Sequence, residues 1–230
     1  MMKIAIMGAM PEEIEPLLSY MKDIKSFELA NNIYYEAKYK GLDLIIAYSK
    51  IGKVFASLTA SVMIEHFKAQ KLLFSGVAGA ISKDLKIGDL IVATKLCQHD
   101  LDITAFGHPY GYVPEGKVYI ESDLELRIVA KEVAKEKRIS IKEGIIATGD
   151  QFVADQNKKE WIKKSFKADA LEMEGAAVAV VCDAFDIPFF IIRAISDAAD
   201  MDAGFDFDKF LKSSSKISAD FIVSMLNKIS

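Results

Sequence analysis

Short apolar runs alternate along this chain with longer stretches in which apolar residues recur every three or four positions. The runs have the length of buried strands, and the longer stretches have the period of helices that pack by one face. They predict strands over residues 3–7, 33–39, 42–48, 71–77, 89–97, 144–148 and 189–197, with a hairpin turn at Lys40 and Gly41. They predict a helix that begins at Pro11 and helices over residues 54–67, 123–138, 158–166 and 207–226. This alternation, without internal repeats, predicts one α/β domain over residues 1–230.

The predicted strand at residues 189–197 ends in a change of chemistry. Its sequence is apolar apart from Arg193 until it reaches the hydroxyl of Ser196 and the carboxylate of Asp197. Open α/β sheets bind their ligands at the carboxyl ends of strands. Ser196 and Asp197 would serve equally well as the N-cap of a following helix.

Four further carboxylates stand at element ends. Glu172 and Glu174 directly precede the almost wholly apolar residues 176–182. Charges next to buried backbone carry a desolvation cost, so they need a function or a partner. Glu12 and Glu13 fall in the first turn of the first helix, where the helix dipole would keep a catalytic base ionised. Stabilisation of that helix alone would explain the same two glutamates.

Glycines mark three turns that resemble ligand loops. Gly8 stands alone, so the dinucleotide fingerprint of three glycines is absent. The pair Gly52 and Lys53 is followed by Val54, where a phosphate loop requires Ser or Thr, so we reject a phosphate loop. The small residues 76–80 would let a ligand approach the backbone, although a simple tight turn would have the same sequence.

The segment after the strand at 89–97 carries His99, Asp100 and Asp102. It lacks the further histidine or carboxylates of a metal site, so we expect a hydrogen-bonded loop and no metal. The aromatic loop at 103–114 has more apolar surface than a bare connection needs, and we expect it to contact a ligand or a partner subunit.

Composition narrows the class of protein. Of the 230 residues 51% are hydrophobic and 27% are charged, which is typical of a globular chain, and no apolar stretch reaches membrane-spanning length. The net charge of −4 argues against nucleic acid as a ligand. Cys97 and Cys182 are isolated in apolar surroundings, which favours reduced thiols in a cytoplasmic protein. We interpret the first ten residues as a strand and its turn, not as a signal sequence.

Six segments carry a resemblance to a known family. They are residues 8–13, 49–53, 75–79, 148–152, 171–175 and 193–197, and they occur in the family's order. Together they resemble the bacterial 5′-methylthioadenosine/S-adenosylhomocysteine nucleosidases of the nucleoside phosphorylase superfamily, over nearly the whole chain. The resemblance implies a three-layer sandwich with a central mixed, twisted β-sheet flanked by helices. It also implies hydrolysis, without a cofactor, of the N-glycosidic bond between adenine and a 5′-modified ribose.

The resemblance implies two catalytic carboxylates. Asp197 would give a proton to N7 of the leaving adenine, with Ser196 orienting its carboxyl. Glu13 would activate the attacking water on the other face of the sugar. Glu174 would accept hydrogen bonds from the ribose hydroxyls, and Met173 would pack against the sugar.

A larger set of substrate-binding residues follows from the same resemblance. In chain order they are Met10, Ile51, Ala78, Gly79, Ile103, Phe106, Phe152, Val153, Glu172, Met173, Glu174, Arg193, Ser196 and Phe207. Phe152 and Val153 would hold the adenine, and Arg193 would help to fix the acidic cluster. Ile103 and Phe106 would come from a second subunit, which implies a homodimer.

Two questions of chemistry follow from the resemblance. The superfamily's phosphorylases bind phosphate partly through an arginine and a serine in the strand that here contains Phe74 and Val77, so water is the favoured nucleophile. The loop at His108 and Pro109 resembles a branch that also cleaves 6-amino-6-deoxyfutalosine in menaquinone synthesis. We therefore expect methylthioadenosine, S-adenosylhomocysteine, 5′-deoxyadenosine and aminodeoxyfutalosine as substrates. The alternatives are a purine nucleoside phosphorylase and a non-catalytic nucleoside-binding protein.

Overall fold

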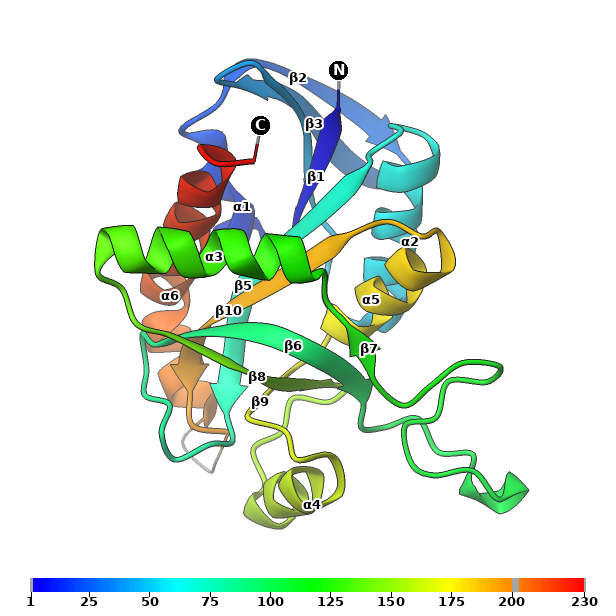
Figure 1. Ribbon diagram of the computed structural model, residues 1–230. Helices are drawn as coiled ribbons and strands as arrows, with labels where there is room; N and C mark the ends of the chain where they lie inside the picture. Colours follow the sequence, from blue (N-terminus) through cyan, green and yellow to red (C-terminus); the bar gives the residue numbers. More distant parts are fainter. Residues whose placement is uncertain (1, 200–202, 230) are drawn as a thin grey trace.

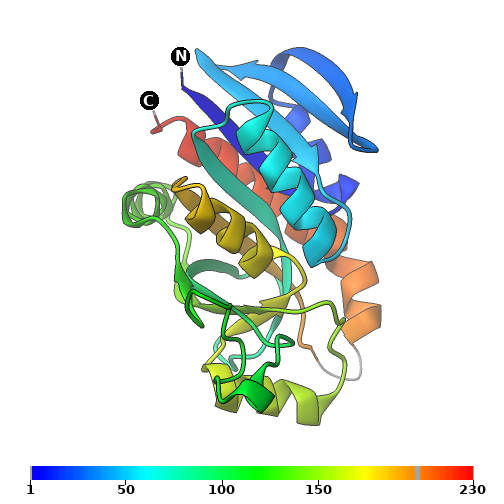
Figure 2. The same cartoon turned by 90° about the vertical axis from the view of Figure 1, so that its right-hand side faces the viewer.

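The computed structural model describes residues 2–199 and 203–229, which form one ten-stranded sheet with helices on both faces (Figures 1 and 2). The strands are β1 (Lys3–Gly8), β2 (Lys22–Leu29), β3 (Asn32–Tyr39), β4 (Leu42–Tyr48), β5 (Lys71–Ala80), β6 (Leu90–Gln98), β7 (Ile120–Glu121), β8 (Ile141–Thr148), β9 (Ala170–Glu172) and β10 (Phe189–Asp197). The helices are α1 (Pro11–Leu18), α2 (Lys53–Glu65), the 3-10 turn η1 (Thr104–Phe106), α3 (Leu124–Lys137), α4 (Gln156–Phe166), α5 (Gly175–Ala184) and α6 (Ala203–Leu226).

The sheet is open at one end and closed at the other. The open part runs in the order β2-β3-β4-β1-β5, with β1 parallel to both of its neighbours. At the other end β5 pairs with β10 and β9, β9 with β8, β8 with β6, and β6 again with β10. These five strands therefore form a closed ring. The sheet is mixed, as expected, but its closure rests on pairings between strands far apart in the sequence.

Two hydrophobic cores lie on opposite faces of the sheet. Helices α2 and α5 cover one face, and α1, α3 and α6 cover the other (Figures 1 and 2). Alternate residues of β10 serve the two cores: Phe189 and Ile191 pack with the first, and Phe190 and Ile192 with the second. This alternation is the strand period of two, and a strand covered on both faces has no need of a polar side. All nine residues of β10 are consequently buried.

Most of the predicted elements are confirmed. The strand at 189–197 has the predicted bounds, and β3 and β4 form the predicted hairpin through Lys40 and Gly41, both at positive φ. The predicted elements did not include β7, β9 or α5, and two further points need correction. No strand was expected at β2, because nearly every residue of it is exposed and an edge strand of this kind lacks the apolar alternation that marks a buried one. Helix α6 begins at Ala203, before the predicted start at 207, because its first turn has no apolar period to show it.

Candidate active site

A cavity of about 280 Å³ opens at the carboxyl ends of β1, β5, β8 and β10. Its lining residues are Ala9, Met10, Glu13, Ile51, Val77, Ala78, Gly79, Gln151, Phe152, Val153, Leu171, Glu172, Met173, Glu174, Ser196, Asp197 and Phe207. All the residues predicted for the site are among them except Arg193, Ile103 and Phe106. The lining residues that the sequence prediction missed are Ala9, Val77, Gln151 and Leu171. Each directly precedes a predicted residue in the sequence, and this adjacency is the feature from which it could have been predicted.

Glu13 is buried at the edge of the cavity and bound by backbone amides. Its Oε2 accepts hydrogen bonds from the amides of Ala9 at 2.5 Å and Met10 at 3.1 Å, and its Oε1 accepts one from Val77 at 2.9 Å. Gly76 makes this approach possible, because a Cβ there would lie 2.5 Å from Oε1. The end of β1, the start of α1 and the middle of β5 thus fix one carboxylate.

The electrostatic environment of Glu13 differs from the expectation. Burial raises the pKa of Glu13, an effect larger than the lowering by the Arg193 charge and by the three amide hydrogen bonds. We expected the helix dipole to hold this group ionised. Desolvation acts in the opposite direction and is the larger influence, because the carboxylate is 2% exposed.

A buried ion pair lies behind the cavity. Nη2 of Arg193 is 2.6 Å from Oε2 of Glu172, and the guanidinium stacks on the ring of Phe74 with its carbon 3.9 Å from the centroid. Glu172 also accepts hydrogen bonds from the Thr148 hydroxyl and from the amides of Glu174 and Gly175. Glu172 therefore lines the cavity with its bonding capacity largely used, and Arg193 supports the site from behind.

Glu174 is the N-cap residue of α5 and is turned toward the start of α2. Its Oε1 accepts a hydrogen bond of 2.8 Å from the amide of Gly52. Burial, followed by the negative charge of Glu172, raises the pKa of Glu174, and the Gly52 hydrogen bond and the charge of Arg193 oppose that rise. A ligand that donates hydrogen bonds to this carboxylate would favour its charged form.

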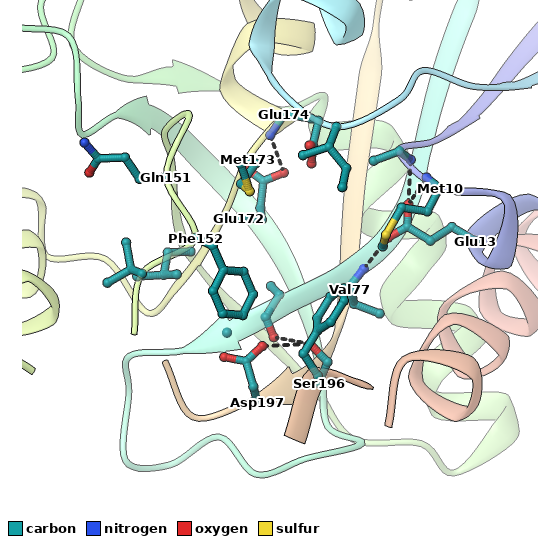
Figure 3. Close-up of a pocket in the computed structure, with 17 residues that line it drawn as sticks. Met10, Glu13, Val77, Gln151, Phe152, Glu172, Met173, Glu174, Ser196 and Asp197 are labelled. Carbon is teal, nitrogen blue, oxygen red and sulfur yellow. Dashed lines mark hydrogen bonds between the residues drawn. The ribbon is translucent and has the colours of Figure 1, made fainter. Parts of the chain in front are cut away.

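Asp197 lies at the other end of the cavity, next to Ser196 (Figure 3). The pairing of β10 with β5 shifts register after Ile195, so that Asp197 stands opposite Gly79. Phe152 forms a neighbouring wall, with its ring edge-on to Phe207 at a centroid distance of 5.7 Å. The cavity thus has carboxylates at both ends and aromatic surface between them.

Ile103 and Phe106 do not reach the cavity of their own chain. They belong to the loop between β6 and β7, which projects from the body of the molecule (Figure 1). Phe106 is 81% exposed. Part of the aromatic surface of this loop is used internally, since His108 stacks on Tyr112 at 4.4 Å.

In the segment after β6, Asp100 and Asp102 make side-chain hydrogen bonds, whereas neither ring nitrogen of the buried His99 has a hydrogen-bond partner within the described residues. Asp100 pairs with Lys53 at 2.7 Å, and Asp102 accepts a hydrogen bond from the amide of Thr104 at 2.9 Å. Within residues 2–199 and 203–229 no three His, Cys, Asp or Glu side chains are grouped so as to hold a metal ion. Nor is any helix in this described part of the chain both long enough and apolar enough to cross a membrane.

Comparisons with known proteins agree with this architecture. The model of the phosphorylase superfamily matches residues 3–227, and the chain belongs to that superfamily. Within it, the chain is 59% identical over 229 residues to an aminodeoxyfutalosine nucleosidase of Campylobacter jejuni, and the match covers 100% of both chains. It is 37% identical over 229 residues to a 5′-methylthioadenosine/S-adenosylhomocysteine nucleosidase of Actinobacillus succinogenes, covering 99% of this chain and 100% of that one.

A solved structure extends the comparison to three dimensions. The 5′-methylthioadenosine/S-adenosylhomocysteine nucleosidase of Helicobacter pylori, crystallised with butyl-thio-DADMe-Immucillin-A, superposes with a TM-score of 0.98 at 50% identity. The match covers 100% of this chain and 99% of the other. The resemblance found in the sequence and the mixed α/β architecture that it implied are therefore confirmed.

Proposed function

We infer that this protein is a nucleosidase that hydrolyses the N-glycosidic bond between adenine and a 5′-modified ribose. The observation that carries this conclusion is a single cavity lined by Glu13, Glu174 and Asp197, in a chain whose full-length relatives are named nucleosidases. Glycosidic cleavage needs an acid at the leaving group and a base at the attacking water. The cavity supplies carboxylates for both positions, with apolar surface between them for a base and a sugar.

Asp197 is the proposed acid. Adenine leaves poorly as an anion, so a proton or a strong hydrogen bond at N7 lowers the barrier. Phe152 and Val153, with Ala78 and Gly79 on the cleft floor, would hold the purine beside the Asp197 carboxyl. The hydroxyl of Ser196 supports that carboxyl from its own strand.

Glu13 is the proposed base. The amides of Ala9, Met10 and Val77 fix both of its oxygens, so a water beside it would meet a carboxylate with little freedom to turn. As the bond breaks, the ribose gains positive charge, which the carboxylates of Glu13 and Glu174 would stabilise. Glu174 would accept hydrogen bonds from the ribose hydroxyls, while Met173 packs on the sugar.

Water is favoured over phosphate as the nucleophile. A phosphate bound here would need backbone amides and a free guanidinium. The amides of Ala9, Met10 and Val77 already bind the Glu13 carboxylate, and Nη2 of Arg193 is paired with Glu172. An incoming phosphate would also meet the negative charge of Glu13 itself.

Aminodeoxyfutalosine is the first substrate to test, because the relative at 59% identity is named for it. Methylthioadenosine, S-adenosylhomocysteine and 5′-deoxyadenosine follow. Met10, Ile51 and Phe207 would form the pocket for the 5′-group. Adenine release from these four nucleosides, measured as kcat/KM, tests the assignment. Release from none of them would refute it.

We propose further that the active form is a homodimer in the cytoplasm. Val54 is 76% exposed, and Phe55 and Leu58 on the same helix are 44% and 42% exposed, an apolar surface near Ile51 at the mouth of the cavity. Phe106 of a second subunit would cover it and, with Ile103, complete the 5′-pocket. The buried free thiols of Cys97 and Cys182 suit a reducing compartment. Phe106→Ala should weaken association in sedimentation velocity and raise KM, and an unaltered dimer with unaltered KM would argue against this arrangement.

A further inference from the structure

The start of α2 is held by carboxylates from other parts of the chain. Its N-cap residue Gly52 has no side chain to satisfy the free amides of the first turn. The amide of Gly52 donates to Glu174 at 2.8 Å, and the next amide, of Lys53, donates to Oδ1 of Asp150 at 2.8 Å. Two carboxylates, one from the start of α5 and one from the turn after β8, therefore cap this helix.

The second of these contacts, between Lys53 and Asp150, belongs to a closed ring of three residues. The amide of Lys53 binds Oδ1 of Asp150, the amide of Asp150 donates to Oδ2 of Asp100 at 2.8 Å, and Oδ1 of Asp100 accepts a hydrogen bond from Nζ of Lys53 at 2.7 Å. Gln98 adds a fourth contact, because its Oε1 accepts a hydrogen bond of 3.0 Å from Nζ of Lys53. The Lys53 and Asp100 side chains are 19% and 14% exposed, so this ion pair is better shielded from solvent than an ordinary surface pair.

The ring leaves little freedom at Gly52. This glycine has a φ of 101°, a conformation that other residues rarely adopt, and a Cβ on it would lie 3.0 Å from Oδ1 of Asp150. The Asp150 carboxylate thus packs closely against the backbone of Gly52. That amide is the backbone donor to Glu174, the residue proposed to bind the ribose hydroxyls.

We propose that the ring of Lys53, Asp100 and Asp150, which we call the α2 clamp, positions the Gly52 amide against Glu174 and so sets recognition of the ribose hydroxyls. The inference rests on the proposed function and adds three positioning residues that do not themselves line the cavity. With Gly52 held, one oxygen of Glu174 is occupied and the carboxylate is fixed in one orientation. Without the clamp, the amide moves away and the carboxylate turns freely.

A comparison of two substrates can distinguish a positioning role of the α2 clamp from a general loss of folded protein. We would measure kcat/KM for methylthioadenosine and for its 2′,3′-dideoxy analogue, and form the ratio of the two. The two nucleosides differ in intrinsic reactivity, but this difference does not depend on the protein variant. A reduced folded fraction lowers both kcat/KM values by the same factor. The ratio therefore changes only if recognition of the hydroxyls changes.

Asp150→Ala removes the acceptor for the Lys53 amide and should lower the ratio about tenfold, the weight of one hydrogen bond to a charged group. Asp150→Asn keeps a carbonyl oxygen at the same place and should stay close to the wild-type ratio. Asp183→Ala is the matched control, because it breaks the exposed pair of Lys117 and Asp183 at 2.9 Å and should leave the ratio unchanged. If Asp150→Ala does not fold, Lys53→Met tests the clamp in the same assay, with a lowered ratio again expected.

An unchanged ratio in Asp150→Ala or Lys53→Met, whatever the loss of rate, would overturn the clamp while leaving the nucleosidase assignment intact. Equal losses of ratio in Asp150→Ala and Asp150→Asn would overturn it too. If the wild-type protein releases adenine from both nucleosides with the same kcat/KM, Glu174 does not recognise the hydroxyls, and the clamp proposal fails with that role. Wild-type protein that releases no adenine from any of the four nucleosides would refute the proposed function itself.

Discussion

The hydroxyl of Ser196 donates a hydrogen bond of 2.9 Å to Oδ2 of Asp197, the residue next to it in the chain. The amide of Ala199 donates to Oδ1 at 2.8 Å, and Gly79 on the neighbouring strand leaves room for that oxygen, since a Cβ there would be 2.7 Å away. The carboxyl is therefore oriented by the end of its own strand and needs no ligand to hold it. These contacts fix the direction in which the carboxyl faces a base bound in the cavity.

Replacing Asp197 should separate catalysis from binding. Asp197→Asn keeps the shape of the side chain but cannot supply a proton to N7, so adenine release should fall by about 10²–10⁴. Nucleoside binding, measured by calorimetry, should persist. Ser196→Ala removes only the orienting hydroxyl, so its loss of rate should be much smaller. Near-normal turnover in Asp197→Asn would refute the acid assignment.

Glu13 and Glu12 offer a matched pair in one helical turn. Glu13→Gln should lower kcat by about 10²–10⁴, because an amide is no base and its single carbonyl oxygen cannot serve both Val77 and the amides of Ala9 and Met10. Glu12→Gln removes the same charge from the helix N-terminus without touching the cavity. It should retain most of the activity. Equal losses in both variants would favour helix stabilisation over a catalytic role.

The spacing of apolar residues predicted those helices and strands whose sequences record which of their faces are buried. The bounds of strand β10 could be predicted because both of its faces are covered. Its sequence is therefore mainly apolar up to Ser196 and Asp197 at its end. The pair of Arg193 and Glu172 and the bond from Gly52 to Glu174 join residues 21 and 122 positions apart. No spacing within one element reveals such contacts. The closure of β6 on β10 was hidden for the same reason, because it depends on tertiary packing.

The raised pKa of Glu174 has a consequence for stability. The folded chain binds this proton more tightly than the unfolded chain, so the contribution of Glu174 to the free energy of unfolding falls as the pH rises above about 4.5. Glu174→Gln removes that titration and can still accept the hydrogen bond from Gly52. It should therefore be more stable than wild type at neutral pH, on the order of 1–3 kcal/mol, although less active.

Denaturant unfolding across a pH series measures this difference. The gain in stability of Glu174→Gln should vanish at pH values below about 4.5, where the wild-type carboxyl is protonated in both states. A gain that is constant with pH would mean that charge burial is not its cause.

The buried ion pair should be costly to break from one side. Arg193→Met leaves Glu172 buried without its cation, and we expect a loss of about 3–5 kcal/mol in the free energy of unfolding. The double variant Glu172→Gln/Arg193→Met should recover part of that loss. Lys117→Met, at an exposed pair, should cost less than about 1 kcal/mol. A comparably small loss in Arg193→Met would mean that water entering the site stabilises Glu172 in place of the cation.

The identity of the nucleophile tests the account most directly. Wild-type protein would be incubated with methylthioadenosine or aminodeoxyfutalosine in phosphate buffer made with ¹⁸O-labelled water, and the sugar product analysed by mass spectrometry. We predict a free reducing sugar that carries one ¹⁸O at C1′, together with adenine, at a rate independent of phosphate. A sugar 1-phosphate, or a rate that rises with phosphate concentration, would contradict hydrolysis and the role assigned to Glu13.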